Sequence, residues 1–153
     1  MQLADADARL SLTLTPSAYQ FPGATAPGDR NWLIIDGQVT QRRNVWVFSE
    51  PCLTTIEAVG LGEWLRRVAD GIEPVAPPGV PSLHFAEPNV AFTLVRYGDD
   101  GAVLRVHLSL ESGPPWEEGE IFAFFLEMSL SAAALPEAAA TWAVDLRDFP
   151  PRL

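Results

Sequence analysis

Strict alternation of apolar and polar residues is the feature that most constrains the fold of this chain. Residues 102–110 show it most clearly, with an apolar face of Leu104, Val106, Leu108 and Leu110 and an outer face of Arg105, His107 and Ser109. A strand has a period of two, so such a segment buries one face and exposes the other. Residues 8–15 alternate in the same way. A Gly-Asp-Asp-Gly turn at 98–101 predicts that a strand at 90–97 pairs with 102–110 as an antiparallel hairpin.

Further strands are expected at 32–40 and 45–49, with a short one beginning at Leu83 and Phe85. Asp36-Gly37 is interpreted as a bulge within one long strand, because a hairpin there would have very short arms. The last strand is predicted at 120–130. Both of its faces are apolar between residues 121 and 126, which predicts that it is covered on both sides, one of them by a helix.

Two helices interrupt the strands. Thr54 and Glu57 have the spacing of a capping box and predict that the first helix begins there. It is expected to bury one stripe, made of Leu61, Trp64, Leu65 and Val68. Pro136 suits the first turn of the second helix, which carries a stripe of Ala139, Trp142, Ala143 and Leu146. The predicted fold class is α+β, a mainly antiparallel β-sheet with two packed α-helices, in a single globular domain spanning residues 1–153.

Charge and cysteine content restrict the partners and the compartment. The chain has ten arginines, no lysine and twenty acidic residues, which give a formal net charge of -10. Such a surface repels nucleic-acid phosphates and anionic lipid and attracts basic partners, so neither nucleic acid nor membrane is an expected partner. Cys52 is the only cysteine, so no intramolecular disulfide forms. Without a signal peptide or an apolar run of membrane-spanning length, the expected localisation is cytoplasmic.

Catalytic motifs are not evident. Cys52 precedes a helix start, but nothing in the sequence pairs it with His84 or His107 as a nucleophile requires, and these residues lack metal-ligand spacing. Gly60 and Gly62 lie inside an amphipathic helix and do not follow a strand, so they do not form a dinucleotide fingerprint. No enzyme activity, no metal and no cofactor are therefore expected.

The densest acidic patch along the sequence surrounds Pro114-Pro115-Trp116. It comprises Glu111, Glu117, Glu118 and Glu120. Adjacent glutamates in a Gly/Pro loop are usually only solvated, but the same pattern also suits the rim of a protein-binding site with Trp116 as its apolar anchor. These five residues are the predicted binding site.

An alternative function stays open alongside this one. A small-molecule-binding or enzymatic α+β domain would have a pocket around Trp32, Trp46, Glu87 and Asn89. A deep cavity with polar groups in its lining would favour the alternative, and a flat acidic face would favour protein binding.

Several aromatic-bearing segments together resemble one family. They are Leu12-Thr13-Leu14 with Tyr19-Gln20-Phe21-Pro22, Asn31 to Gly37, Leu53-Thr54 before a helix containing Trp64-Leu65, Phe85 to Asn89, Glu111 with Pro114-Pro115-Trp116, and Phe149 to Arg152. This order is similar to the WapI family of bacterial immunity proteins. The resemblance implies a cytoplasmic, non-enzymatic partner that neutralises the carboxy-terminal domain of a contact-dependent toxin, often a nuclease. With the acidic charge, it predicts binding to a basic toxin domain or another basic protein. The family's toxin-contacting residues are not defined by motifs, so the resemblance assigns none to this chain.

Overall fold

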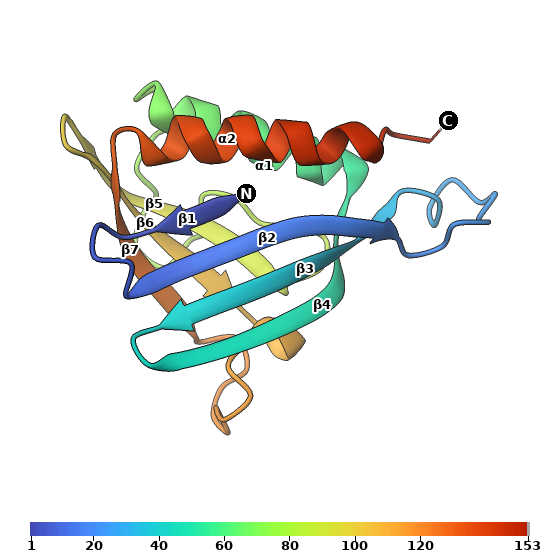
Figure 1. Cartoon of the computed structure of the whole chain (residues 1–153), viewed down its shortest axis with the longest axis horizontal. Helices are drawn as coiled ribbons and strands as arrows, with labels where there is room; N and C mark the ends of the chain where they lie inside the picture. The colour runs from blue at the N-terminus through green and yellow to red at the C-terminus, as the bar shows by residue number, and fades with distance from the viewer. Residues whose placement is uncertain (153) are drawn as a thin grey trace.

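The computed structural model describes residues 1–152 and contains two antiparallel sheets (Figure 1). The four-stranded sheet has the order β1 (Gln2–Ala4), β2 (Leu10–Tyr19), β3 (Trp32–Gln41) and β4 (Asn44–Thr54). The three-stranded sheet has the order β5 (Val90–Gly98), β6 (Gly101–Leu108) and β7 (Phe125–Ser131). The predicted antiparallel α+β fold is confirmed, with the strands divided between two sheets. The strand β1, which is only three residues long, was not predicted.

Two helices, α1 (Thr55–Ala69) and α2 (Ala134–Asp145), lie side by side above the sheets in Figure 1. The predicted capping box at the start of α1 is confirmed: the Thr54 hydroxyl accepts from the backbone N–H of Glu57, whose carboxylate accepts from the backbone N–H of Thr54. Trp142 of α2 is fully buried and donates its indole N–H to the Ala58 carbonyl of α1 at 2.7 Å. This hydrogen bond joins the two helices at the centre of their contact.

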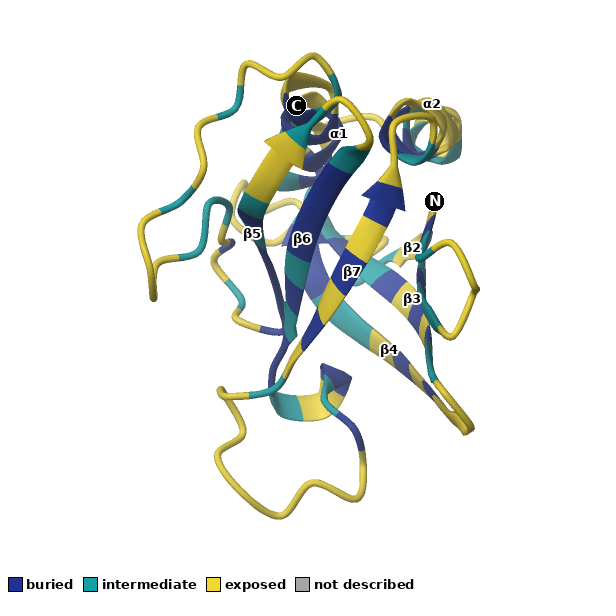
Figure 2. Cartoon of the chain, turned by 90° about the vertical axis from the view of Figure 1, so that its left-hand side faces the viewer, coloured by how far each residue is buried: buried dark blue, intermediate teal, exposed yellow. Residues whose placement is uncertain are grey.

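A continuous hydrophobic core lies between the two sheets and the helices. Figure 2 shows buried and exposed residues alternating along β7, as the period-two pattern predicts. The core contains the predicted stripe of α1 and the inward residues of the long strands, including Leu12, Leu14, Leu33, Ile35, Phe92, Leu94, Leu104, Val106, Leu126 and Met128. The sheets and helices therefore stabilise one another through shared apolar burial.

The expected bulge at Asp36-Gly37 is wrong, although β3 is one continuous strand as predicted. Asp36 and Gly37 pair regularly with both neighbouring strands, and the register shifts lie elsewhere, between Pro16 and Ala18 of β2 and opposite the Leu33–Ile35 step of β3. Gly37 has a packing role instead. A Cβ atom there would lie 2.1 Å from the Phe48 ring, so the missing side chain makes room for that ring.

The last strand is shorter than predicted, because β7 begins at Phe125 and residues 120–124 belong to a loop. Ile121 and Phe122 are exposed, and Phe125 lies on the outer face of its sheet with the Arg105 guanidinium 4.7 Å from its ring centre. No helix within residues 1–152 covers that face (Figure 2). The prediction of burial on both sides was therefore wrong, since the apolar run there lies largely on the surface.

Two smaller expectations also change. The strand expected at Leu83 and Phe85 is reduced to one isolated bridge between Leu83 and Phe92. Leu110, expected to point inward at the end of a strand, has a φ of 54° and begins a short 3-10 helix, η1 (Leu110–Ser112). A second 3-10 turn, η2 (Leu146–Asp148), follows α2. Within residues 1–152, neither kind of helix offers a segment long and apolar enough to cross a membrane.

The end of the described chain is fastened to the connection between β2 and β3, an arrangement that we call the C-terminal clasp (residues 19–31 and 149–152). The Asn31 side chain donates to the Arg152 carbonyl at 3.0 Å and accepts from the Arg152 N–H at 2.7 Å. The Tyr19 hydroxyl donates to the Pro150 carbonyl. The Tyr19 ring packs edge-on against Phe149, and the Arg152 guanidinium lies over the face of the Tyr19 ring. Tyr19, Asn31 and Phe149 to Arg152, which belong to segments that carry the family resemblance, therefore hold the end of the described chain against the β2–β3 connection.

Candidate functional site: the Trp116 loop

The segment between η1 and β7, which we call the Trp116 loop (residues 113–124), extends away from the helices at the bottom of Figure 1. Its base is closed by backbone hydrogen bonds. The N–H of Leu110 donates to the Ile121 carbonyl at 3.1 Å, and the N–H of Leu108 donates to the Phe124 carbonyl at 3.2 Å. The bond between Leu108 and Phe124 continues the pairing of β6 with β7 by one residue, and the bond between Leu110 and Ile121 lies just beyond it. The loop therefore leaves the sheet from a fixed base.

Trp116 is held on one side and open on the other. Its ring is 48 % exposed and lies edge-on to Trp46 of β4, with ring centres 5.3 Å apart. Trp46 is nearly buried, donates its indole N–H to the Ser112 carbonyl at 3.1 Å, and also contacts the Phe124 ring. Aromatic rings prefer such edge-to-face contacts. The exposed part of Trp116 is therefore presented to solvent in a set orientation.

Three of the four predicted glutamates accompany Trp116 in this loop. Glu117, Glu118 and Glu120 are exposed, and none of them forms an ion pair with any residue in the described part of the chain. Glu111 lies in η1 at the base of the loop, where its carboxylate accepts from the Asn89 side chain at 3.2 Å. The structure thus places Glu111 in a supporting position and leaves three carboxylates free around the tryptophan.

The only thiol and the histidines do not form a reactive pair. Cys52 is fully buried, and burial raises the pKa of its thiol to about 12, with the carboxylates of Glu50, Glu111 and Glu87 adding to the rise. At neutral pH this thiol is protonated and is a poor nucleophile.

The two histidines lie in different environments, one half-buried and one exposed. His107 Nε2 lies 2.8 Å from the Thr93 hydroxyl, and burial together with the neighbouring Arg105 lowers its pKa. His84 is exposed. Among residues 1–152, no three His, Cys, Asp or Glu side chains are placed to hold a metal ion.

The alternative pocket does not form from the residues expected to line it. Trp32 pairs with Thr54, whereas Trp46 pairs with Val39, seven residues further along β3. This separation corresponds to about 24 Å along a strand. Asn89 is buried and donates its side-chain N–H to the Glu111 carboxylate, and Glu87 is half-buried with its charge acting on Cys52. Trp46, predicted to line this pocket, instead supports the Trp116 ring, a role that was not predicted. No local signal indicates that contact, because the two tryptophans are far apart in the sequence.

A second surface feature was also missed. Arg9, Arg42 and Arg43 line an open hollow of about 720 Å³ at the end of the four-stranded sheet. The signal for it was present in the sequence, because Gln41 to Asn44 lies between two alternating segments with the spacing of a two-residue hairpin. The hairpin places two arginines at its tip.

The fold and the site define an α+β protein of two antiparallel sheets whose acidic loop and held tryptophan suit a protein partner. The comparison with protein families gives the particular family. The model of the Immunity protein WapI-like family matches residues 3–150, so the chain belongs to this family, as the resemblance in its motifs indicated. Membership supports an immunity function and a toxin as the partner. A search of curated proteins found no match.

Proposed function

We propose that this protein is a non-enzymatic immunity protein of the cytoplasm that neutralises a basic toxin domain by binding it with the Trp116 loop. One observation carries the proposal: a half-exposed tryptophan, oriented by a buried one, stands among three carboxylates that have no partner within the described chain. Exposed tryptophans that fill a partner's pocket are common binding hot spots. The contact with Trp46 lowers the cost of ordering the ring on binding.

A nuclease domain is the toxin class that best fits the charge of this loop. A domain that acts on nucleic acid carries a basic surface for phosphates. Glu117, Glu118 and Glu120 offer carboxylates to the same kind of surface, and the net charge of -10 attracts it from a distance. Binding there would cover the phosphate-binding surface, so neutralisation requires no chemistry by the immunity protein.

Association kinetics with the toxin domain encoded beside this gene test the charge part of the proposal. Glu117→Lys with Glu118→Lys should slow association about tenfold at low salt and change dissociation little, because rim charges act mainly on the encounter. Raising the salt should slow association of the wild type, since charges are screened beyond about 8 Å at physiological ionic strength. Asp99→Lys with Asp100→Lys is the matched control. It makes the same charge change in the β5–β6 hairpin, at the other end of the molecule from the loop (Figure 1).

The tryptophan is tested by dissociation. Trp116→Ala should speed dissociation about thirtyfold, because a hot-spot side chain contributes 2 kcal/mol or more to binding. Phe21→Ala is the control, since Phe21 is an exposed ring of similar accessibility in the β2–β3 connection. Normal binding by the loop variants would remove this loop from the interface. Failure of the wild type to bind the toxin or to protect cells from it would overturn the proposed function.

A further inference from the structure

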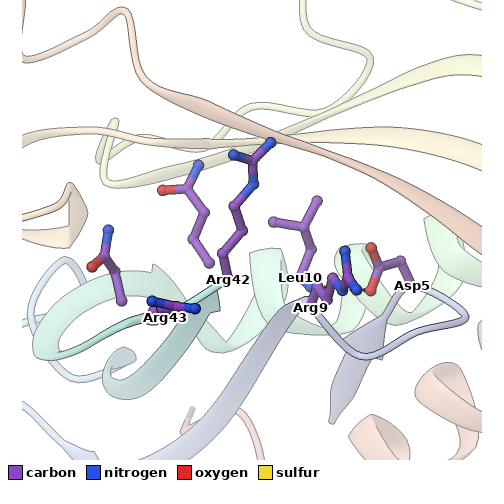
Figure 3. Close-up of a pocket in the computed structure, with 7 residues that line it drawn as sticks. Asp5, Arg9, Leu10, Arg42 and Arg43 are labelled. Atoms are coloured by element: carbon purple, nitrogen blue, oxygen red, sulfur yellow. Dashed lines mark hydrogen bonds between the residues drawn. The ribbon is translucent and has the colours of Figure 1, made fainter.

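The arginine hollow, lined by Arg9, Arg42 and Arg43, gathers three of the ten arginines of this acidic chain. Arg9 precedes β2, and Arg42 and Arg43 form the tip of the hairpin between β3 and β4. Figure 3 shows Arg42 standing up from the hairpin tip, Arg43 lying beside it, and Arg9 with Asp5 on the other side of the hollow. The segment before β2 and the tip of the β3–β4 hairpin thus bring three arginines to one hollow.

The backbone of the hairpin fixes the position of Arg42 at the tip. Its φ is 58°, in the left-handed region that glycine adopts without strain and other residues rarely adopt. A two-residue hairpin with positive φ at its first position usually has glycine there. The Arg42 N–H donates to the Arg9 carbonyl at 2.6 Å, which fixes the tip beside the start of β2.

Of the three arginines at the hollow, Arg9 is paired with a carboxylate, and within residues 1–152 Arg42 and Arg43 have no ion pair. The Arg9 side chain forms an exposed ion pair with Asp7 at 3.3 Å, and one Asp5 carboxylate oxygen accepts from the backbone N–H of Leu10. In residues 1–152, neither Arg42 nor Arg43 has a carboxylate within ion-pair distance. The amide side chains of Gln41 and Asn44 complete the polar lining.

We propose that this hollow binds the phosphate group of a small ligand. Each guanidinium presents a planar fork of N–H donors that matches phosphate oxygens. A phosphate group presents three oxygens and a charge of about -1.5 to -2 at neutral pH, whereas a carboxylate presents two oxygens and one charge, so two or three guanidinium groups match a phosphate better. A long nucleic acid is disfavoured, because the whole chain carries a charge of -10 and two aspartates adjoin the hollow. A compact phosphate needs only the local arrangement.

The site is separate from the proposed toxin-binding loop, because none of its lining residues belongs to residues 113–124. Its test uses the whole protein without any toxin. Isothermal titration calorimetry would measure binding of pyrophosphate, of AMP, of glutarate as a dicarboxylate, and of a short DNA duplex. Tighter binding of pyrophosphate than of AMP would identify free phosphate as the source, and the reverse would identify a nucleotide.

Arg42→Gly with Arg43→Gln is the deciding variant. Glycine suits the backbone at position 42, so the fold is expected to be kept, and a thermal unfolding scan would verify this. Arg66→Gln with Arg147→Gln makes the same charge change at exposed positions away from the hollow. We expect the hollow variant to bind pyrophosphate or AMP at least about tenfold more weakly than the wild type, with the control unchanged. Three results would overturn the proposal: no binding of either phosphate at millimolar concentration, equal losses in both variants, or preference for glutarate or the duplex.

Discussion

The C-terminal clasp and the Trp116 loop are both irregular, proline-containing and aromatic, yet they differ in where their polar groups find partners. In the clasp, the Asn31 side chain forms hydrogen bonds with both the N–H and the carbonyl of the Arg152 backbone. The Arg152 guanidinium also lies over the Tyr19 ring. In the loop, the glutamates around Trp116 make no ion pairs within the described chain. Segments of similar composition therefore hold parts of the chain together in the clasp and leave polar groups unpaired on the surface of the Trp116 loop.

The difference lies in the long-range contacts. The clasp joins residues separated by more than a hundred positions, with donors and acceptors matched on both sides. Within residues 1–152, the loop is held by backbone hydrogen bonds at its base and by the contacts of the Trp116 and Phe124 rings with Trp46. Internal hydrogen bonds stabilise a fold, whereas unpaired charges on a fixed loop stabilise a complex only when a partner arrives.

The largest expected effect tests whether the base of the loop is closed as firmly as the clasp. Cys52 lies in β4 close enough to Glu111 of η1 to feel its charge, so opening of this region would expose the thiol. We expect thiol reagents to label the native protein at least about a thousandfold more slowly than the unfolded chain, because labelling requires opening. A colorimetric thiol assay with and without denaturant measures this. Rapid native labelling would show that the base opens on its own.

The same residue gives a pH dependence of known sign. Its pKa is raised from 9.0 to about 12 in the folded state, so between these values the unfolded chain has lost the thiol proton that the folded chain keeps. Cys52 therefore contributes a loss of stability as pH rises through that window, and none below it. Denaturant melts at several alkaline pH values, compared with Cys52→Ala, measure the contribution. An identical pH slope in both proteins would contradict it.

The second effect concerns the clasp. Asn31→Ala should lower the free energy of unfolding by about 2 kcal/mol, because it leaves the Arg152 N–H and carbonyl without their partner. Asn31→Asp is the matched variant: it keeps the acceptor and loses the donor, so we expect roughly half of that loss. Urea unfolding with intrinsic tryptophan fluorescence gives both values. Unchanged urea midpoints in both variants would show that the hydrogen bonds of Asn31 do not contribute to the free energy of unfolding.

The smallest effect is expected in the loop. Trp116→Ala should lower the free energy of unfolding by less than about 1 kcal/mol, because the ring is half exposed and loses one edge-on aromatic contact. The same urea experiment measures it. A loss as large as that of Asn31→Ala would mean that Trp116 belongs to the core, and the contrast between the two regions would no longer hold.

Local patterns in the sequence predicted much of the framework. Thr54 and Glu57 located the start of α1, because a capping box depends on residues only three positions apart. The alternation of Leu104, Val106 and Leu108 identified β6, and the turn at 98–101 located the hairpin with β5. The resemblance in the motifs indicated the family, which the family model then matched over residues 3–150.

Longer-range features were decided by tertiary structure. The apolar residues 121–124 have the composition of a strand, but the regular pairing of β6 with β7 begins only at Phe125. Residues 121–124 keep single backbone hydrogen bonds at Ile121 and Phe124, and Ile121 and Phe122 lie on the surface. Likewise, nothing near Trp116 in the sequence indicates that its ring lies edge-on to Trp46, or that the Glu111 carboxylate accepts from Asn89.

The sequence by itself thus determined the elements, their antiparallel class, the acidic charge and the family, since each depends on residues close in the chain or on composition alone. Only the tertiary structure decided which glutamates stay free around Trp116 and which arginines meet at the hollow. The physical reason is that a side chain becomes part of a site through the contacts it lacks as much as through those it makes. Both depend on which distant segments the fold brings beside it.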